Sequence, residues 1–250
     1  MIRRLPFYSP PPTRIVAWEG PSALDPSVTI RAICTGLGDA SHNPKTGAMV
    51  QLWIVLKYMA PHDATRTGED IAVCGLCPKR PSAERNGALP CYVRAFQGPR
   101  SVWQASQGQG VDTEGALRAI ERSGRAIRLG AYGDPAALPI DLVSALAFAA
   151  NGHTGYTHQW RQQSAQAFRA LLMASADTPE DRDLAHVLGW RTFRSIDRRQ
   201  AFADLAPNEI FCPSSQGVQC NDCGLCDGSR GAWWSRGQQD KRKSIAIFEH

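Results

Sequence analysis

Residues 170–181, ALLMASADTPED, carry the clearest structural signal in the chain. The first seven are apolar or small and have the length of a buried strand. Thr178 can then cap a helix that has Pro179 at its first position and two acidic residues in its first turn. The stretch therefore predicts a strand that leads directly into a helix.

The same alternation recurs along most of the chain. Further strand-length apolar segments begin near residues 126, 153, 190 and 209, and helical patterns separate them. Before the first of these strands, Asp112 and Thr113 can cap a helix that stops at Gly124. Three upstream candidates lie at 28–34, 49–57 and 91–96. Alternating strands and helices are typical of a parallel α/β fold, and eight strands predict a (β/α)8-like barrel, closed or incomplete. A doubly wound open sheet is the alternative, but no GxGxxG loop follows the first strand.

Composition separates the chain into three parts. We expect a proline-rich arm at 1–27, a barrel-like α/β domain at 28–212 with a cysteine-bearing insertion at 71–98, and a cysteine-rich segment at 213–250 packed on the barrel. Apolar residues make up 43% of the 250 residues and charged residues 20%, which excludes disorder as the main state.

No run of eighteen apolar residues occurs, so we expect no transmembrane helix. The N-terminus has basic residues but lacks the apolar core of a signal peptide, which predicts a cytoplasmic protein. The net charge of +5 is compatible with a phosphate-bearing partner and equally with an ordinary basic enzyme.

Eight cysteines in a reducing compartment indicate metal ligands or reactive groups rather than disulfides. Near the C-terminus the spacing is C-x7-C-x2-C-x2-C, and the two-residue gaps let thiolates turn back onto one ion. Two ligand sets are open: four cysteines, or the last three with the terminal His250. Zinc suits either set, and a four-iron cluster is the alternative metal. The candidate ligands are Cys212, Cys220, Cys223, Cys226 and His250.

A second cysteine group lies upstream. Cys74 and Cys77 form a C-x2-C knuckle, and Cys91 follows after thirteen residues. This set is one ligand short of four, and Cys34 or His42 are the candidates to complete it.

The predicted carboxyl ends of the strands collect polar and aromatic side chains, where parallel α/β folds place their chemistry. Paired carboxylates from Asp134 and Asp177 would divide the nucleophile and acid/base roles. The alternative is that Asp134 forms a turn and that Asp177 helps to cap a helix. The glycine and proline around Asp134 predict a carboxylate that projects at the rim instead of capping the next helix.

The other strand-end residues suggest a pocket for a flat heterocycle. Tyrosine and tryptophan rings can stack on a base, and a glutamine can bind its edge. His158 is either a site residue or a core residue. The predicted substrate-binding residues are Tyr132, Tyr156, His158, Gln159, Trp160 and Arg194.

Several phrases resemble a group of uncharacterised phage and prophage proteins over roughly residues 30–250. They are CGLCPKRP, CYVRAFQGP, GAYGDPAALP, TGYTHQW, LLMASAD, GWRTFR and CPSSQGVQCNDCGLCDG. That resemblance implies a phage-encoded protein in the host cytoplasm and implies no activity.

A more distant similarity is to queuine tRNA-guanine transglycosylases and the phage enzymes that insert 7-deazaguanines into DNA. Cys220, Cys223 and Cys226 followed by His250 look like a variant of that family's C-x-C-x2-C…His zinc motif, with one extra residue in the first gap. The resemblance implies a zinc-containing barrel that exchanges guanine for a 7-deazaguanine, on DNA in preference to tRNA. It assigns the two catalytic aspartates to Asp134 and Asp177, although their surroundings depart from the family's motif.

Two other classes stay open. A radical-SAM-like iron–sulfur barrel would explain the cysteines, but its C-x3-C-x2-C after the first strand is absent. A non-catalytic, zinc-stabilised nucleic-acid-binding phage protein is the third. Colour, metal content and guanine exchange separate the three.

Overall fold

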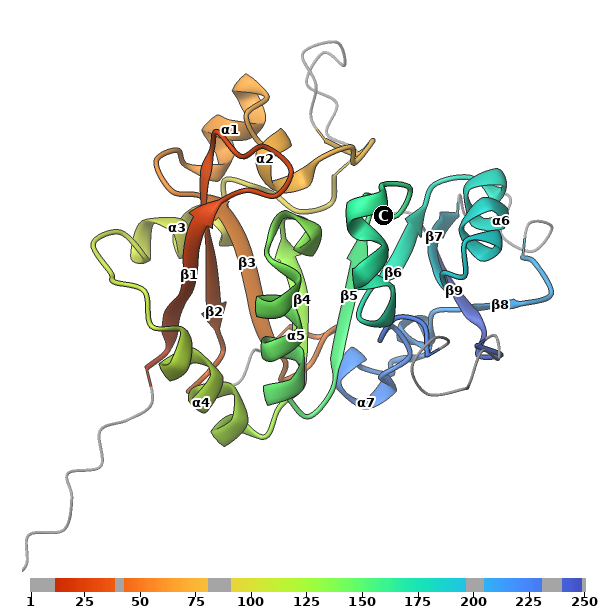
Figure 1. Ribbon diagram of the computed structural model, residues 1–250. Coiled ribbons are helices and arrows are strands. Elements are labelled where there is room, and N and C mark those ends of the chain that lie inside the picture. The colour runs from red at the N-terminus through yellow and green to blue at the C-terminus, as the bar shows by residue number, and fades with distance from the viewer. Residues whose placement is uncertain (1–11, 39–42, 81–90, 197–204, 231–239, 249–250) are drawn as a thin grey trace, which may run out of the picture.

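The computed structural model describes residues 12–38, 43–80, 91–196, 205–230 and 240–248 (Figure 1). They form a nine-stranded sheet with the order β1-β2-β3-β4-β5-β6-β7-β9-β8. The strands are β1 Arg14–Pro21, β2 Thr29–Thr35, β3 Val50–Leu56, β4 Ile127–Tyr132, β5 His153–Thr157, β6 Met173–Ala176, β7 Thr192–Ile196, β8 Glu209–Phe211 and β9 Ser244–Phe248.

The predicted α/β class is confirmed, but a closed parallel barrel is wrong. Strands β1, β2 and β3 pair antiparallel, and every later pairing is parallel. In the described sheet β1 and β8 are edges and do not pair with each other. The strand order still follows the chain almost throughout, as in a (β/α)8 barrel. Closure fails because an antiparallel meander takes the place of the first βα unit.

Two strands escaped the sequence analysis. Strand β1 lies inside the predicted arm, where neighbouring prolines hide its RIVAWEG pattern. Strand β9 lies in the predicted metal segment and inserts between β7 and β8, so that segment is part of the sheet rather than only packed on it. The uncertain strand at 91–96 is irregular instead.

The helices follow the predicted capping signals. Asp112 accepts a hydrogen bond from the Gly115 amide at the start of α4, and Thr178 accepts one from the Asp181 amide at the start of α6. The α-helices are α1 Pro61–Thr67, α2 Ile71–Cys74, α3 Gly98–Ala105, α4 Thr113–Ser123, α5 Ile140–Ala149, α6 Pro179–Val187 and α7 Cys220–Cys223, with 3₁₀ helices η2 Pro135–Ala137, η3 Gln163–Ala170 and η4 Pro213–Gln216.

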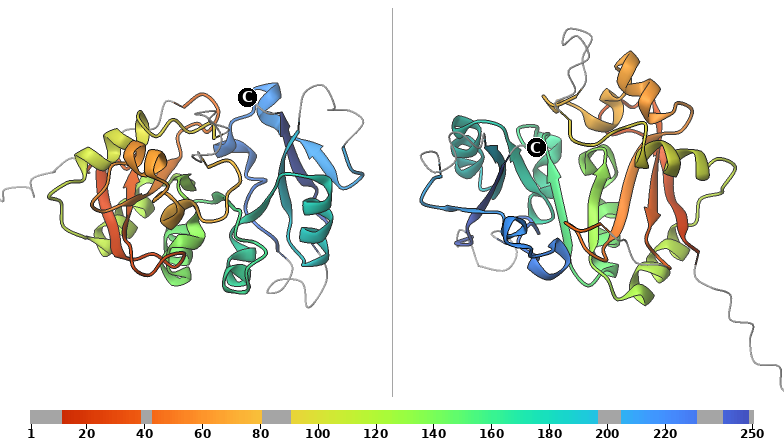
Figure 2. Two further views of the ribbon diagram at one scale, coloured as in Figure 1. Left: turned by 90° about the horizontal axis from the view of Figure 1, so that it is seen from above. Right: turned by 180° about the vertical axis from the view of Figure 1, so that it is seen from behind.

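The two faces of the sheet have different coverings. Figure 2 shows α5 and α6 on one side and the cysteine-rich segment with α7 on the other. Side chains alternate between the faces along each strand. Tyr156, Phe193 and Ile245 therefore point toward the cysteine segment, and all three line a cavity there.

A buried ion pair ties the last strands together. Arg194 on β7 donates to both carboxylate oxygens of Glu209 on β8, at 3.0 and 2.7 Å, and both side chains are at most 3% exposed. Burial alone would raise the pKa of Glu209, but the hydrogen bonds from Arg194 outweigh it and hold that pKa below its ordinary value. Arg194 is thus committed to a structural pair, and its predicted role in substrate binding is not supported.

We expect Glu209→Gln to lower the free energy of unfolding by about 3–5 kcal/mol, because it removes the carboxylate charge that the buried Arg194 guanidinium pairs with. Because the folded state lowers the pKa of Glu209, the ionised carboxylate stabilises the fold at pH values above the ordinary glutamate pKa of about 4.3. This stabilisation is lost as the pH falls through the lower folded-state pKa. Urea unfolding from pH 7 to pH 3 tests both points, with the exposed Glu114→Gln as control. Equal stability of the two variants would contradict the prediction.

Candidate functional site

A cluster of five side chains forms where the carboxyl ends of β5, β6 and β7 meet. The Nε2 atom of His158 lies 3.3 Å from Oδ2 of Asp177 and 3.9 Å from the Cys77 sulfur. Lys79 Nζ lies 3.9 Å from Oδ1 of Asp177 and donates to Ser195 Oγ at 3.0 Å. The structure therefore brings together His158, Asp177 and Cys77, which the sequence analysis had singled out separately. We call these five residues the edge cluster.

The side chains around His158 shift its pKa. Burial alone would lower the pKa of His158, but the Asp177 carboxylate and the Cys77 thiolate raise it to about 10. Asp177 does not cap α6, since Thr178 does so, and its side chain is 24% exposed. Asp177 is thus a carboxylate that a substrate can reach.

Asp134 has a different environment, and the prediction for its carboxylate was wrong. It caps η2 by accepting from the Ala136 amide, and it also accepts from Thr157 Oγ1, the His158 amide and Gln159 Nε2, all within 3.1 Å. Asp134 is 7% exposed. Four donors on one buried carboxylate fit a group that orders the β4–β5 edge rather than a nucleophile.

Gln159 holds the C-x2-C knuckle in place. Its side-chain amide donates to the Cys74 carbonyl at 3.2 Å and its oxygen accepts from the Leu76 amide at 3.2 Å. Gly75 between them has φ +55°, and an added Cβ would stand 2.5 Å from the Gln159 amide, so only glycine fits. The predicted contact of Gln159 with a base edge is replaced by this contact with the knuckle.

The predicted aromatic pocket is not assembled. Trp160 is fully buried and donates to the Ser175 carbonyl, which makes it a core residue that cannot stack on a base. Tyr132 and Tyr156 face different cysteine groups: Tyr132 lies near Cys74, while Tyr156 hydrogen-bonds Cys226 and tilts against Phe193.

The upstream cysteines lie close together. Burial raises the pKa of Cys74 well above its ordinary value, and the adjacent Asp70, Cys77 and Cys91 add to the rise. Two buried polar atoms next to these thiols, the Tyr132 hydroxyl and Oδ2 of Asp70, have no hydrogen-bond partner in the described structure. Unsatisfied buried polar atoms indicate a missing ion, water or ligand.

The sequence offered Cys34 and His42 as the fourth ligand of the group formed by Cys74, Cys77 and Cys91. Cys34 is fully buried inside β2, where burial raises its pKa to about 12, and it pairs with Ile15 and Leu52 across the sheet. His42 lies outside the described residues.

The C-terminal cysteines line one cavity. Cys212, Cys220, Cys223 and Cys226 surround a space of ≈ 40 Å³ on the face of the sheet opposite α5 and α6. Burial raises the pKa of Cys226 to about 12, and the three neighbouring cysteines contribute. We call these residues the four-cysteine site. His250, the alternative ligand, lies outside the described residues.

Cationic side chains border the four-cysteine site. Lys45 lines its cavity, and burial lowers the Lys45 pKa although the thiolates of Cys212 and Cys220 oppose that shift. Arg128 lies near Cys220 and donates to the Tyr92 hydroxyl.

Within the described residues no three His, Cys, Asp or Glu side chains stand in the geometry of metal ligands. Four thiols that line one cavity could hold a soft metal ion, and Lys45 and Arg128 nearby would offset the negative charge of a four-thiolate complex.

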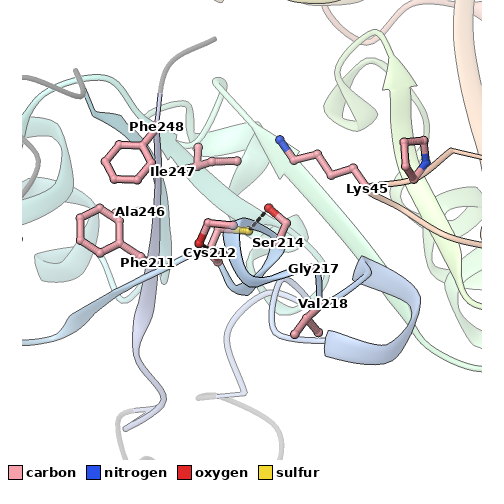
Figure 3. A pocket seen from close by; sticks show the side chains of 11 residues that line it. Lys45, Phe211, Cys212, Ser214, Gly217, Val218, Ala246, Ile247 and Phe248 are labelled. Carbon is pink, nitrogen blue, oxygen red and sulfur yellow. Dashed lines mark hydrogen bonds between the residues drawn. The ribbon is translucent and has the colours of Figure 1, made fainter.

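A larger cavity of ≈ 310 Å³ adjoins this site (Figure 3). The rings of Phe211 and Phe248, stacked at 4.9 Å, form one wall and Lys45 the opposite side, with Cys212 and Ser214 between them. The Cys212 sulfur lies 3.1 Å from Ser214 Oγ. The volume and the aromatic wall are typical of a small-molecule pocket.

The pocket and the edge cluster share one face of the sheet. Ser195 of the edge cluster is the direct cross-strand partner of Ile247, which lines the pocket. Directly opposed residues on neighbouring strands present their side chains to the same face. Ile247 therefore links the pocket to the edge cluster through its neighbour Ser195.

The sequence analysis missed Phe211, Phe248, Lys79 and Ser195 as site residues. The alternating pattern SIAIF at 244–248 signals the strand that presents Phe248. No local pattern marks Lys79 or Ser195, because only the fold brings Lys79 to both Asp177 and Ser195.

Comparisons of the chain with protein-family models, with curated proteins and with solved structures returned no match. Among the described residues, no helix has the length and apolar character needed to cross a bilayer.

Proposed function

We propose that this protein is a metal-dependent enzyme that modifies a base of nucleic acid, with base exchange as its reaction. The observation that carries the proposal is the aromatic-walled pocket on the same face as the reachable carboxylate of Asp177. A flat heterocycle fits against Phe211 and Phe248, and Lys45 can neutralise a phosphate or an acidic ring nitrogen. The net charge of +5 supports a polyanionic partner.

The reacting groups follow from the geometry of the edge cluster. Asp177 attacks the anomeric carbon, the glycosidic bond breaks, and its electron pair leaves with the base, which takes up a proton. The incoming base then displaces Asp177 from the same carbon and releases the proton of its attacking nitrogen to solvent, so the proton taken up by the leaving base is balanced. Asp134 positions the β4–β5 edge in this scheme and does not react.

Zinc is the proposed metal at the four-cysteine site, with Cys212, Cys220, Cys223 and Cys226 as ligands. A four-iron cluster on the same thiolates is the second candidate, and it would favour the iron–sulfur alternative. The larger pocket reaches Cys212, and a purely structural zinc site needs no pocket beside its ligands. This pocket is therefore the observation that supports the second candidate. Colourless protein with stoichiometric zinc supports the first reading, and brown protein supports the second.

The test of base exchange is incorporation of tritiated guanine into DNA and into tRNA, with unlabelled 7-deazaguanine as competitor. We expect wild-type protein to incorporate label, and Phe248→Ala to raise KM for the free base by roughly 5–100-fold, since stacking on one aromatic ring contributes about 1–3 kcal/mol. Phe148→Ala is the control, because Phe148 is 93% exposed on α5. No incorporation with either nucleic acid by metal-loaded protein would refute base exchange and leave the iron–sulfur enzyme and the non-catalytic nucleic-acid-binding protein as alternatives.

A further inference from the structure

The upstream cysteine group holds three thiols and lacks a fourth donor among the cysteines of the described chain. Cys74 and Cys77 come from the knuckle that ends α2, and Cys91 lies beside them. Gln159 and Gly75 fix the knuckle against the loop that follows β5. The same loop carries His158.

We infer that Cys74, Cys77, Cys91 and His158 bind a second metal ion, separate from the four-cysteine site. The decisive distance is 3.9 Å between the Cys77 sulfur and Nε2 of His158. In a tetrahedral zinc site, with a Zn–S bond of about 2.3 Å and a Zn–N bond of about 2.05 Å, these atoms stand roughly 3.6 Å apart. The sulfur and nitrogen are thus already near the separation that a shared ion requires.

The surroundings match a metal site independently of that distance. The Tyr132 hydroxyl, buried and without a partner in the described structure, lies near Cys74 and Cys91 and can donate to a metal-bound thiolate. The backbone amide of His158 donates to Asp134 at 2.9 Å. This hydrogen bond fixes the His158 backbone, from which the imidazole side chain extends. Groups that orient the ligands in this way accompany protein metal sites generally.

Two carboxylates compete with His158 for the fourth position. Asp177 Oδ2 approaches the same Nε2 atom at 3.3 Å, and Asp70 has one oxygen unpartnered within the described residues. Asp70 is already bound to Arg80 at 2.6 Å through its other oxygen, and a thiolate-rich set favours imidazole over carboxylate for zinc. His158 is therefore the assigned ligand.

This site goes beyond the proposed base exchange, and its test needs no activity. Full-length protein loaded with ¹¹³Cd should give two NMR resonances, one in the range of four sulfur ligands and one shifted upfield into the range of three sulfurs and one nitrogen. His158→Ala should lose the second resonance and one of two bound metal equivalents, while His62→Ala, a half-buried histidine of α1, keeps both. Asp70→Asn and Asp177→Asn should also keep both.

Several results would overturn the inference. They are a wild-type protein with one metal equivalent, two resonances in the four-sulfur range, or full metal content in His158→Ala. Loss of the resonance in Asp70→Asn or Asp177→Asn with retention in His158→Ala would give the fourth position to that carboxylate. Guanine exchange with a single bound metal would support the proposed function and refute this site.

Discussion

Cys226→Ser and Cys223→Ser should each lose one metal equivalent and lower the melting temperature more than any other single change described. Four thiols line the same cavity, and structural zinc bound by such ligands contributes about 10–16 kcal/mol of apparent binding free energy in small peptides. The site also joins two strands, since β8 runs into Cys212 and β9 contributes Ile245 and Ile247 to the cavity wall. Losing the metal should therefore loosen β8, α7 and β9 together.

Metal analysis, calorimetry and hydrogen exchange measure these effects. Cys34→Ala is the matched control, because Cys34 is a buried cysteine of β2 away from both groups and should keep every metal equivalent. Full metal content and unchanged melting in Cys223→Ser and Cys226→Ser would show that the thiols are not ligands. Fast exchange confined to residues 71–96 would place the affected metal in the upstream group instead.

Asp177→Asn should reduce base exchange by roughly 10²–10⁴-fold, the range that a positioned acid, base or nucleophile contributes. The carboxylate is partly exposed and touches His158 and Lys79, so removing its charge leaves the fold intact. No covalent adduct with nucleic acid should form on denaturing gels. The control is Asp183→Asn, an exposed aspartate of α6 that pairs with Arg182.

Asp134→Asn provides the contrast. Its amide NH₂ group would face one or more of the donors that now point at the carboxylate, so the free energy of unfolding should fall by about 1.5–3 kcal/mol. Activity per folded, metal-loaded molecule should change far less than in Asp177→Asn. The reverse order of activities would return the reacting role to Asp134 and contradict the assignment made from the hydrogen bonds.

Local signals predicted most of the regular structure. The caps at Asp112 and Thr178 and the apolar runs at β2 to β7 are properties of short segments, and each formed where the sequence placed it. The cysteine spacing likewise predicted that Cys220, Cys223 and Cys226 lie close together, because a C-x2-C-x2-C run is close in space in almost any fold, whereas β8 brings Cys212 to the same cavity.

Tertiary structure determined whether the sheet closes and which carboxylate stays accessible, because both depend on contacts between residues far apart in the sequence. Whether the sheet closes depends on the direction of β1 and β2 and on the insertion of β9, and both depend on pairings between distant residues. Asp134 and Asp177 look alike in sequence, since each follows a strand and precedes a proline or a capping threonine. Only the fold surrounds Asp134 with four donors and leaves Asp177 beside His158 and Lys79. The reason is that most of these partners lie on other strands or loops, tens of residues away in the sequence.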